Sequence, residues 1–214
     1  MDFLGKGKVV AMIKRRMIVL SGLALTGLVC ISCGTPATGP ANAEVAKGAH
    51  AGGSPLADIT SAVCVVRPTA GNQTSGVVTF QQADGKVTIV ADLKGLKPNA
   101  EHAIHIHKFG DARSADGKSA GGHYNPEGHP HGSPTVPDAE HHAGDLGNLQ
   151  ADENGEAHYT LTVDDITIGG SKNPILGRSI IIHGGQDDYK SQPSGAAGPR
   201  VGIGVIGIAN PDVH

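Results

Sequence analysis

Short runs of apolar and β-branched residues, separated by glycine, proline and small polar residues, make up most of the chain from residue 58 onward. Within several runs apolar and polar side chains alternate, which places the apolar ones on one face of an extended strand. The runs predict β-strands over residues 63–67, 75–82, 86–96, 102–109, 158–163, 178–183 and 201–209.

The residues between these runs are typical of turns. Asp-Gly at 84–85 is a strong hairpin signal, and Lys-Pro-Asn at 97–99 and Glu-Asn-Gly at 153–155 are turn sequences as well. No stretch longer than a turn or two carries apolar residues at helical spacing. The sequence therefore predicts an all-β sandwich or barrel.

Two long segments do not fit the strand pattern. Residues 110–141 and 184–200 are rich in glycine, proline and polar side chains. Loops of this length inside a compact domain are usually functional. The chemistry of the protein is therefore expected in these two segments and at the strand ends beside them.

The first 33 residues have the layout of an export signal, in which a basic stretch precedes an apolar run from 17 to 33. A small residue stands directly before Cys33, and this resembles a bacterial lipoprotein signal with Cys33 as the lipidated residue. Cys30 fits that role less well because the bulky Val29 precedes it, and Cys30 itself stands where the lipoprotein pattern prefers leucine. An uncleaved membrane anchor is the alternative. Both alternatives predict a domain outside the cytoplasm.

Residues 34–57 are mostly Gly, Ala, Pro and Ser, with too few bulky apolar side chains to offset the entropy cost of ordering them. We expect a flexible linker there, between a signal peptide of residues 1–33 and one folded domain of residues 58–214. The expected location is the periplasm or the outer face of the cell membrane, with a lipid anchor at Cys33.

The charge and the histidine content narrow the function. The net charge is −3 and acidic and basic residues are interspersed, so the sequence lacks the basic patch of a nucleic-acid-binding protein. Histidine is unusually frequent, with 12 residues. Because imidazole is the commonest neutral metal ligand among side chains, this content favours a metal site.

His105 and His107 are separated by one residue within a predicted strand, so their side chains point to the same face. This pair alone fits two polar residues on a solvated strand face equally well. The remaining candidates follow at strand ends and in the long loops, and they are His123, His131, His142, Asp145 and His183. Only folding could bring these scattered side chains together.

Six stretches, taken in order, resemble the copper/zinc superoxide dismutase family, and they are residues 105–111, 119–126, 131–134, 142–148, 177–183 and 198–209. Six motifs in the same order and with the correct spacing are far more specific evidence for a family than any single motif. The resemblance covers approximately residues 59–210. It implies a Greek-key β-sandwich or flattened eight-stranded barrel with two long functional loops. It also implies an enzyme that disproportionates superoxide to dioxygen and hydrogen peroxide, here in antioxidant defence of the cell envelope.

The resemblance also implies the ligands of the two metals. Copper would be held by His105, His107, His123 and His183, and zinc by His123, His131, His142 and Asp145, with His123 bridging both. Imidazoles suit both oxidation states of copper, and three imidazoles with one carboxylate suit a closed structural zinc site. Gly-Ser-Pro follows His131, which selects it over the nearby His129. Ala-Gly-Asp follows His142, which selects it over His141.

Further roles follow from the same resemblance. Asp187 corresponds to an aspartate that links a copper-binding histidine to a zinc-binding one and fixes both tautomers. Arg200 corresponds to the arginine at the mouth of the copper channel, where its charge would dock superoxide. His123 would take up and release a proton during turnover, and Lys190 would add to the steering. The alternatives are an ordinary loop carboxylate for Asp187 and an arginine paired with a carboxylate for Arg200.

The sequence departs from the family in one structural element. The family ties the loop after the first histidine pair to the last strand by a disulfide, and the corresponding positions are Gly117 and Ile203. Such a bond contributes about 2–4 kcal/mol and anchors the loop that shapes the dimer surface, so a homodimer is left open. Zinc binding and aliphatic packing around Ile203 are the expected compensation. Cys64 is expected to be a small buried apolar residue.

Two other functions remain as alternatives at this point. A copper or zinc buffer of the same fold would keep the ligands but would have no use for an anion guide such as Arg200. A structural or adhesive β-sandwich lipoprotein would leave the correctly spaced ligands unexplained. Superoxide is therefore the expected substrate, and copper and zinc are the expected cofactors.

Overall fold

The computed structural model describes residues 55–136 and 140–213. Within them the chain forms eight strands and one short 3₁₀ helix, namely β1 (Ser61–Pro68), β2 (Ser75–Ala83), β3 (Lys86–Lys94), β4 (Glu101–His107), η1 (Lys118–Ala120), β5 (Asp145–Gln150), β6 (Ala157–Val163), β7 (Ser179–His183) and β8 (Arg200–Ile208). The predicted signal peptide, with Cys33, and nearly all of the predicted linker lie outside the described residues.

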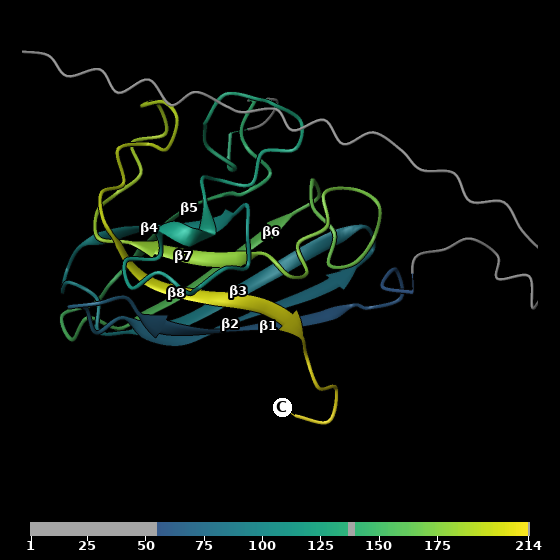
Figure 1. Cartoon of the computed structure of the whole chain (residues 1–214), viewed down its shortest axis with the longest axis horizontal. Helices are drawn as coiled ribbons and strands as arrows, with labels where there is room; N and C mark the ends of the chain where they lie inside the picture. Colours follow the sequence, from purple (N-terminus) through teal and green to yellow (C-terminus); the bar gives the residue numbers. More distant parts are fainter. Residues whose placement is uncertain (1–54, 137–139, 214) are drawn as a thin grey trace, which may run out of the picture. The chain divides into compact units, whose positions relative to one another are not determined.

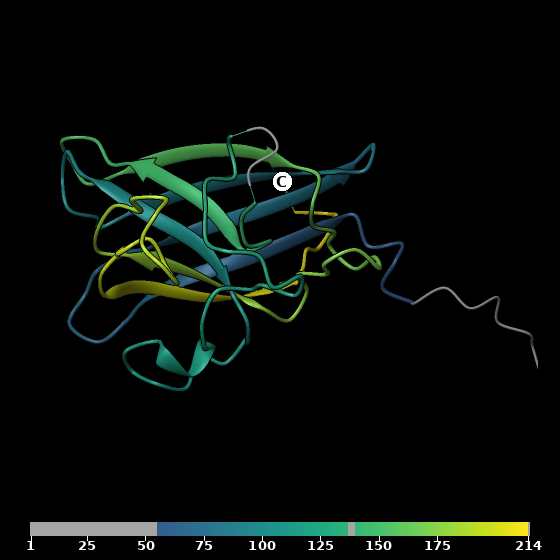
Figure 2. The same ribbon diagram turned by 90° about the horizontal axis from the view of Figure 1, so that it is seen from above.

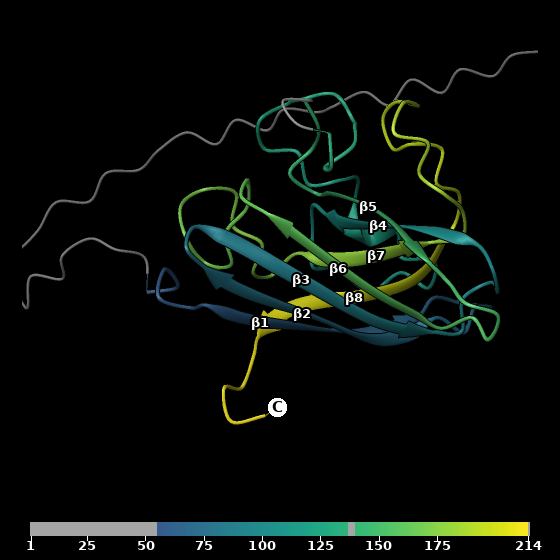
Figure 3. The same ribbon diagram turned by 180° about the vertical axis from the view of Figure 1, so that it is seen from behind.

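The strands follow the order β5-β4-β7-β8-β1-β2-β3-β6, and all hydrogen-bonded neighbours are antiparallel. The sheet curls so that its two end strands, β5 and β6, approach each other and nearly close a barrel (Figures 1 and 3). The connections β3 to β4 and β6 to β7 each cross the barrel to a distant strand position, as in a Greek key. The predicted all-β barrel is confirmed.

Seven of the strands coincide with the predicted runs, and β5 is the one that the pattern missed. Its sequence, Asp-Leu-Gly-Asn-Leu-Gln, holds no β-branched residue and includes a glycine with φ of 85°. The low β-propensity of these residues argues against a strand there. Pairing with β4 from Glu101 to His105 overrides that weak local preference.

The hairpin between β2 and β3 shows how turn chemistry sets register. Asp84 and Gly85 have φ values of 50° and 74°, so both central residues are left-handed, as a tight hairpin turn of the I′ kind requires. The ladder then runs without a break from Ala83↔Lys86 to Ser75↔Lys94.

The barrel interior is filled by aliphatic side chains, and β4 and β7 each divide their residues between this core and the outside face. Ile104 and Ile106 of β4 belong to the main core, as do Ile180 and Ile182 of β7. Because side chains alternate along a strand, His105 and His107 must point away from that core. They are nevertheless 0% and 1% exposed, so other parts of the chain cover them.

The cover comes from the two long loops. The segments after β4 and after β7 both rise over the side of the barrel formed by β4, β5 and β7, as Figure 1 shows in teal and yellow. Figure 2 shows the same loops from above, with η1 at the margin of the barrel. The strands thus fix one wall of a site and the loops supply the other. No helix within residues 55–136 and 140–213 is long and apolar enough to cross a membrane.

Candidate metal centre

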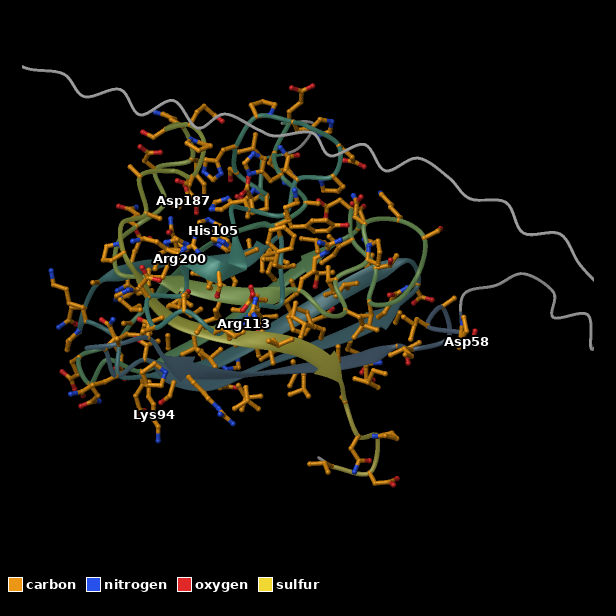
Figure 4. The ribbon with its side chains drawn as sticks, viewed as in Figure 1. Asp58, Lys94, His105, Arg113, Asp187 and Arg200 are labelled. Carbon is orange, nitrogen blue, oxygen red and sulfur yellow. The ribbon has the colours of Figure 1, made fainter. Side chains whose placement is uncertain are left out.

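The predicted ligands converge under the two loops. His105 and His107 come from β4, His183 ends β7, and Asp145 begins β5. His123, His131 and His142 come from the loop between β4 and β5. Figure 4 shows that His105, Asp187 and Arg200 lie close together in this region, far from Lys94 and Asp58.

Four histidines form the first group, and they are His105, His107, His123 and His183, with one ring nitrogen of each within 4.8 Å of the others. In each of them one ring nitrogen is buried and has no hydrogen-bond partner among the described residues, namely Nδ1 of His105 and Nε2 of the other three. A buried polar atom without a partner is costly. Four such atoms facing one point fit a bound cation that prefers imidazole ligands.

The opposite ring nitrogens of this group are held by the protein. His107 Nδ1 lies 2.9 Å from the carbonyl oxygen of Gly121, and His183 Nδ1 lies 3.2 Å from that of Gly198. Because a carbonyl oxygen only accepts, each Nδ1 must donate its proton, which leaves a lone pair on Nε2. His105 is oriented in the same way, with Nε2 2.8 Å from Asp187 Oδ2. The protein therefore presets the tautomers in which the free nitrogens can bind a metal.

The second group joins His123, His131, His142 and Asp145. Nδ1 of His123 lies 2.8 Å from Asp145 Oδ1, and Nδ1 of His142 lies 3.2 Å from the same oxygen. Nδ1 of His131 lies 3.0 Å from Asp145 Oδ2. A tetrahedral zinc site with ligand distances of about 2.0–2.1 Å has ligand-to-ligand edges of about 3.3 Å. The observed separations lie just below those edges and are shared between the two carboxylate oxygens, so the four side chains are close enough together to hold one zinc ion.

Asp187 joins the two groups. Its Oδ2 lies 2.8 Å from His105 Nε2, and its Oδ1 lies 2.8 Å from His131 Nε2. All three side chains are fully buried. The carboxylate thus accepts from one histidine of each group, and it is not an ordinary loop carboxylate.

Asn148 holds Asp187 in place, and the sequence reasoning missed this residue. Its Oδ1 accepts from the Asp187 backbone N–H at 2.7 Å, and its Nδ2 donates to the Asp187 carbonyl at 2.9 Å. The side chain of Asn148, a residue of β5, thus forms two hydrogen bonds with the backbone of the loop after β7. Only the fold brings positions 148 and 187 together, so no local signal could have found the pair.

Arg200 lines a cavity of about 450 Å³ that reaches the first group. His107, His123, His183 and Pro193 also line this cavity. The guanidinium donates to the carbonyls of Gly117 and Gly121 at 2.6 Å each. No carboxylate within the described residues forms an ion pair with Arg200, and its side chain lines the cavity with its charge uncompensated by a direct partner. Lys190 lines a separate hollow with Ser133 and Tyr189.

The electrostatics of the site follow from burial and from the two carboxylates. Burial lowers the pKa of His183 to about 3 and that of His123 to about 4. Burial opposes a charge on His131 as well, but hydrogen bonds to Asp145 and Asp187 outweigh it and raise the pKa of His131 to about 9. The pKa of Asp145 is lowered despite its burial, because the imidazoles of His123, His131 and His142 lie against the carboxylate and favour its charged form. Burial therefore favours the neutral imidazoles of His107, His123 and His183 in the metal-free site, beside the two carboxylates.

Histidines outside the two groups occupy different environments. His129 and His141, the sequence neighbours of candidate ligands, lie 3.8 Å from Glu127 and 4.0 Å from Asp165 instead. His158 forms an exposed pair with Asp92. His102 is 2% exposed, and its Nδ1 donates to the carbonyl of His183 at 2.8 Å. His102 thus supports the backbone of a candidate ligand. His214 lies outside the described residues.

The positions of the missing disulfide are filled by packing. Ile203 is 7% exposed and forms a small apolar cluster with Ala120 and Ile181. Gly117 has φ of 72°, and a Cβ there would stand 3.5 Å from the Arg200 and Thr69 side chains. Cys64 is fully buried in the core and free, and burial raises the pKa of its thiol to about 12. The prediction that Cys64 is a small buried apolar residue is confirmed.

Comparison with known proteins decides the family. The profile described as copper/zinc superoxide dismutase (SODC) matches residues 74–206. The chain belongs to the copper/zinc superoxide dismutase family.

Curated relatives agree with this assignment. The "Superoxide dismutase [Cu-Zn]" of Cordyceps militaris is 42% identical over 160 residues, which is 71% of this chain and 100% of the relative. The protein of the same name from Yarrowia lipolytica is 43% identical over 70% of this chain and 99% of the relative. That of Schizosaccharomyces pombe is 44% identical over 69% of this chain and 97% of the relative. The predicted family is confirmed, and copper and zinc are its metals.

Proposed function

We propose that the protein is a superoxide dismutase that converts superoxide to dioxygen and hydrogen peroxide. The observation that carries the proposal is the set of four buried, unpartnered histidine nitrogens, three of them on histidines that line the same cavity as Arg200. A metal buffer of the same fold would need the nitrogens but not a cation directed at the cavity. Family membership supports the same activity.

We assign copper to His105, His107, His123 and His183, and zinc to His123, His131, His142 and Asp145. The first set offers only imidazole nitrogens, which suits copper in both oxidation states. The second set offers three imidazoles and a carboxylate close together, which suits zinc. His123 belongs to both sets, so its two ring nitrogens would face the two metals.

Copper held there would supply one-electron transfer in both directions, so that one superoxide leaves as dioxygen and a second, with two protons, leaves as hydrogen peroxide. Arg200 attracts the anion into the cavity and orients it, because its guanidinium is fixed by two carbonyls. His123 lines the cavity, and its buried Nε2 has no hydrogen-bond partner, so it is the atom available to hold and release a proton near the substrate.

The activity is tested with the purified full-length chain, reconstituted with copper and zinc and compared with a His183→Ala variant. We expect rapid copper-dependent loss of superoxide in the unsubstituted protein. The variant should lose both the activity and about one equivalent of copper. Stoichiometric copper binding with negligible turnover would contradict the dismutase and would favour the metal buffer.

We also propose that the protein is exported and held at the outer face of a membrane by a lipid on Cys33, in the manner of a bacterial lipoprotein. The support is the basic stretch followed by an apolar run and a small residue before Cys33. The relatives described above are fungal and do not address this segment. Mass spectrometry of the mature protein is the test. A lipid-modified N-terminal Cys33 supports the proposal, and an intact N-terminus contradicts it.

We further propose that a second copy of the chain covers an apolar face on β1 and β8. Val65 and Val205 are 54% and 41% exposed and line one groove with Ile203. The loop carrying Phe109, itself 50% exposed, adjoins Val205. A patch shared by two identical copies would bury these side chains in one isologous contact. Sedimentation of the full chain and of Val65→Lys tests this. A dimer that the substitution dissociates is expected, and a monomeric unsubstituted chain contradicts it.

A further inference from the structure

One exposed side chain of the loop after β7 holds the backbone of a candidate zinc ligand. The Gln192 Oε1 accepts from the His131 backbone N–H at 2.8 Å, and its Nε2 donates to the His131 carbonyl at 2.9 Å. The two residues are 61 positions apart and lie on different long loops. The single carboxamide thus satisfies both backbone groups of His131.

The same loop also holds the ring of His131. Asp187 Oδ1 lies 2.8 Å from the ring Nε2, which leaves Nδ1 directed at Asp145. His131 is therefore fixed at its backbone by Gln192 and at its ring by Asp187. Both partners come from one segment of the chain.

The backbone of Gly195 lies directly against Asp187 and the ring of His131. A Cβ at this position would overlap Asp187 Oδ1 and would stand 2.7 Å from His131 Nε2. The Gly195 backbone is itself fixed, because its N–H donates to the Ser191 carbonyl at 2.7 Å and its carbonyl accepts from the Asp188 N–H at 2.9 Å. Only a residue without a side chain permits the loop to lie against the carboxylate.

We propose that Gln192 and Gly195 form a clamp that positions His131 for zinc. The clamp orders His131 before the metal binds, so less conformational entropy is lost on binding. Gln192 acts through the backbone and Gly195 acts through the orientation of Asp187. Both are positioning residues, since neither touches the metal. This inference rests on the proposed assignment of the zinc ligands.

The first test is the zinc affinity of Gln192→Ala in the full chain, measured by competition with a chromophoric chelator. We expect zinc binding about 10-fold weaker, with copper affinity and the melting temperature of the metal-free protein nearly unchanged. Gln150→Ala is the matched control, because the Gln150 amide donates only to the carbonyl of its neighbour Ala151. Gln192→Glu retains the acceptor for the His131 N–H and should recover part of the affinity.

The second test compares Gly195→Ala with Gly128→Ala. Both glycines have positive φ, at 65° and 77°, but a Cβ at Gly128 would meet nothing within 4 Å. Backbone strain is thus common to both variants, and the collision with Asp187 is confined to the first. We expect Gly195→Ala alone to shift the imidazole N–H resonances of His105 and His131 in the metal-free protein and to weaken zinc binding.

The outcomes separate this inference from the proposed function. Wild-type zinc affinity in both Gln192→Ala and Gly195→Ala would overturn the clamp while leaving the zinc site intact. An equal loss of zinc and copper affinity, together with a lower melting temperature of the metal-free protein, would also overturn it, since that result indicates general destabilisation. An unsubstituted chain that binds no zinc would refute both the site and the clamp.

Discussion

Arg200 and His107 share one acceptor, because the Arg200 guanidinium donates at 2.6 Å to the same Gly121 carbonyl that lies 2.9 Å from His107 Nδ1. The residue assigned to anion docking is thereby tied to a residue assigned to copper. A substitution of either residue should therefore alter the hydrogen bonding of the other.

Removal of the Arg200 charge should slow the reaction without emptying the site. We expect Arg200→Ala to lower the second-order rate constant with superoxide about 10-fold or more, and to weaken its dependence on ionic strength, because electrostatic attraction speeds association. The rate constant of Arg200→Lys should lie between those of the unsubstituted protein and Arg200→Ala. Lys94→Ala removes the same charge far from the site and should have little effect (Figure 4). Pulse radiolysis measures the rate constant and its dependence on ionic strength, and metal analysis checks that the site is still filled. Equal rate constants for all variants would refute the docking role.

Asp187→Asn should weaken zinc binding. The amide offers one oxygen where the carboxylate offers two, so it cannot accept from both His105 and His131. We expect an affinity about 10-fold lower, read by chelator competition. Asp58→Asn removes a carboxylate far from the site and is the control (Figure 4). Unchanged zinc affinity in Asp187→Asn would show that the link between the two groups is dispensable.

His102→Ala should destabilise the metal-free protein by about 1–3 kcal/mol, because it removes the donor to the buried His183 carbonyl. His158→Ala is the matched comparison, since its pair with Asp92 is exposed and such pairs contribute about 0–1 kcal/mol. Urea unfolding gives both free energies of unfolding. A cost for His158→Ala that equals or exceeds that of His102→Ala would contradict the structural role of His102.

Zinc should stabilise the fold in the absence of the family disulfide. A ligand that binds only the folded state adds about 4 kcal/mol when its free concentration is 1,000 times its Kd. We therefore expect the melting temperature to fall when a chelator removes zinc and to recover when zinc is added back. Equal melting temperatures for zinc-loaded and metal-free protein would rule out this compensation and would leave the packing around Ile203 as the remaining candidate.

The stability of the metal-free protein should be greatest near neutral pH. The pKa values of His183 and His123 are lowered to about 3 and about 4, so the unfolded chain binds more protons than the folded one below about pH 6.5. Stability therefore falls as the pH drops from that value. The pKa of His131 is raised to about 9, so its contribution is complete below about pH 6.5 and is lost as the pH rises through about 9.

The acid side should be the steeper one, because the lowered pKa values of His107, His123 and His183 all act there. The lowered pKa values of Asp145 and Asp187 act in the same direction below about pH 5. Urea midpoints between about pH 4 and about pH 9 are the measurement. A midpoint that rises steadily toward acid would contradict burial of neutral imidazoles at this site.

The sequence pattern predicted seven strands because alternation and β-branched residues mark a half-buried strand. β5 escaped because Gly147 and its polar neighbours carry no such signal, and only pairing with β4 makes it a strand. The candidate ligands, which the structure brings together, could be named from the sequence because each lies in a recognisable motif. Asn148, Gln192 and His102 act through contacts between distant segments, and a side chain that bonds a remote backbone leaves no trace in its local sequence.

Cys64 lies in the core, and a Cβ at Gly204 would come within 2.5 Å of its Sγ. It is the only cysteine within the described residues, and its thiol is unpaired. The stability of this domain therefore does not depend on the thiol redox potential of its surroundings. Reducing agents should leave the barrel intact, and the barrel can form without an oxidase or isomerase to assist it.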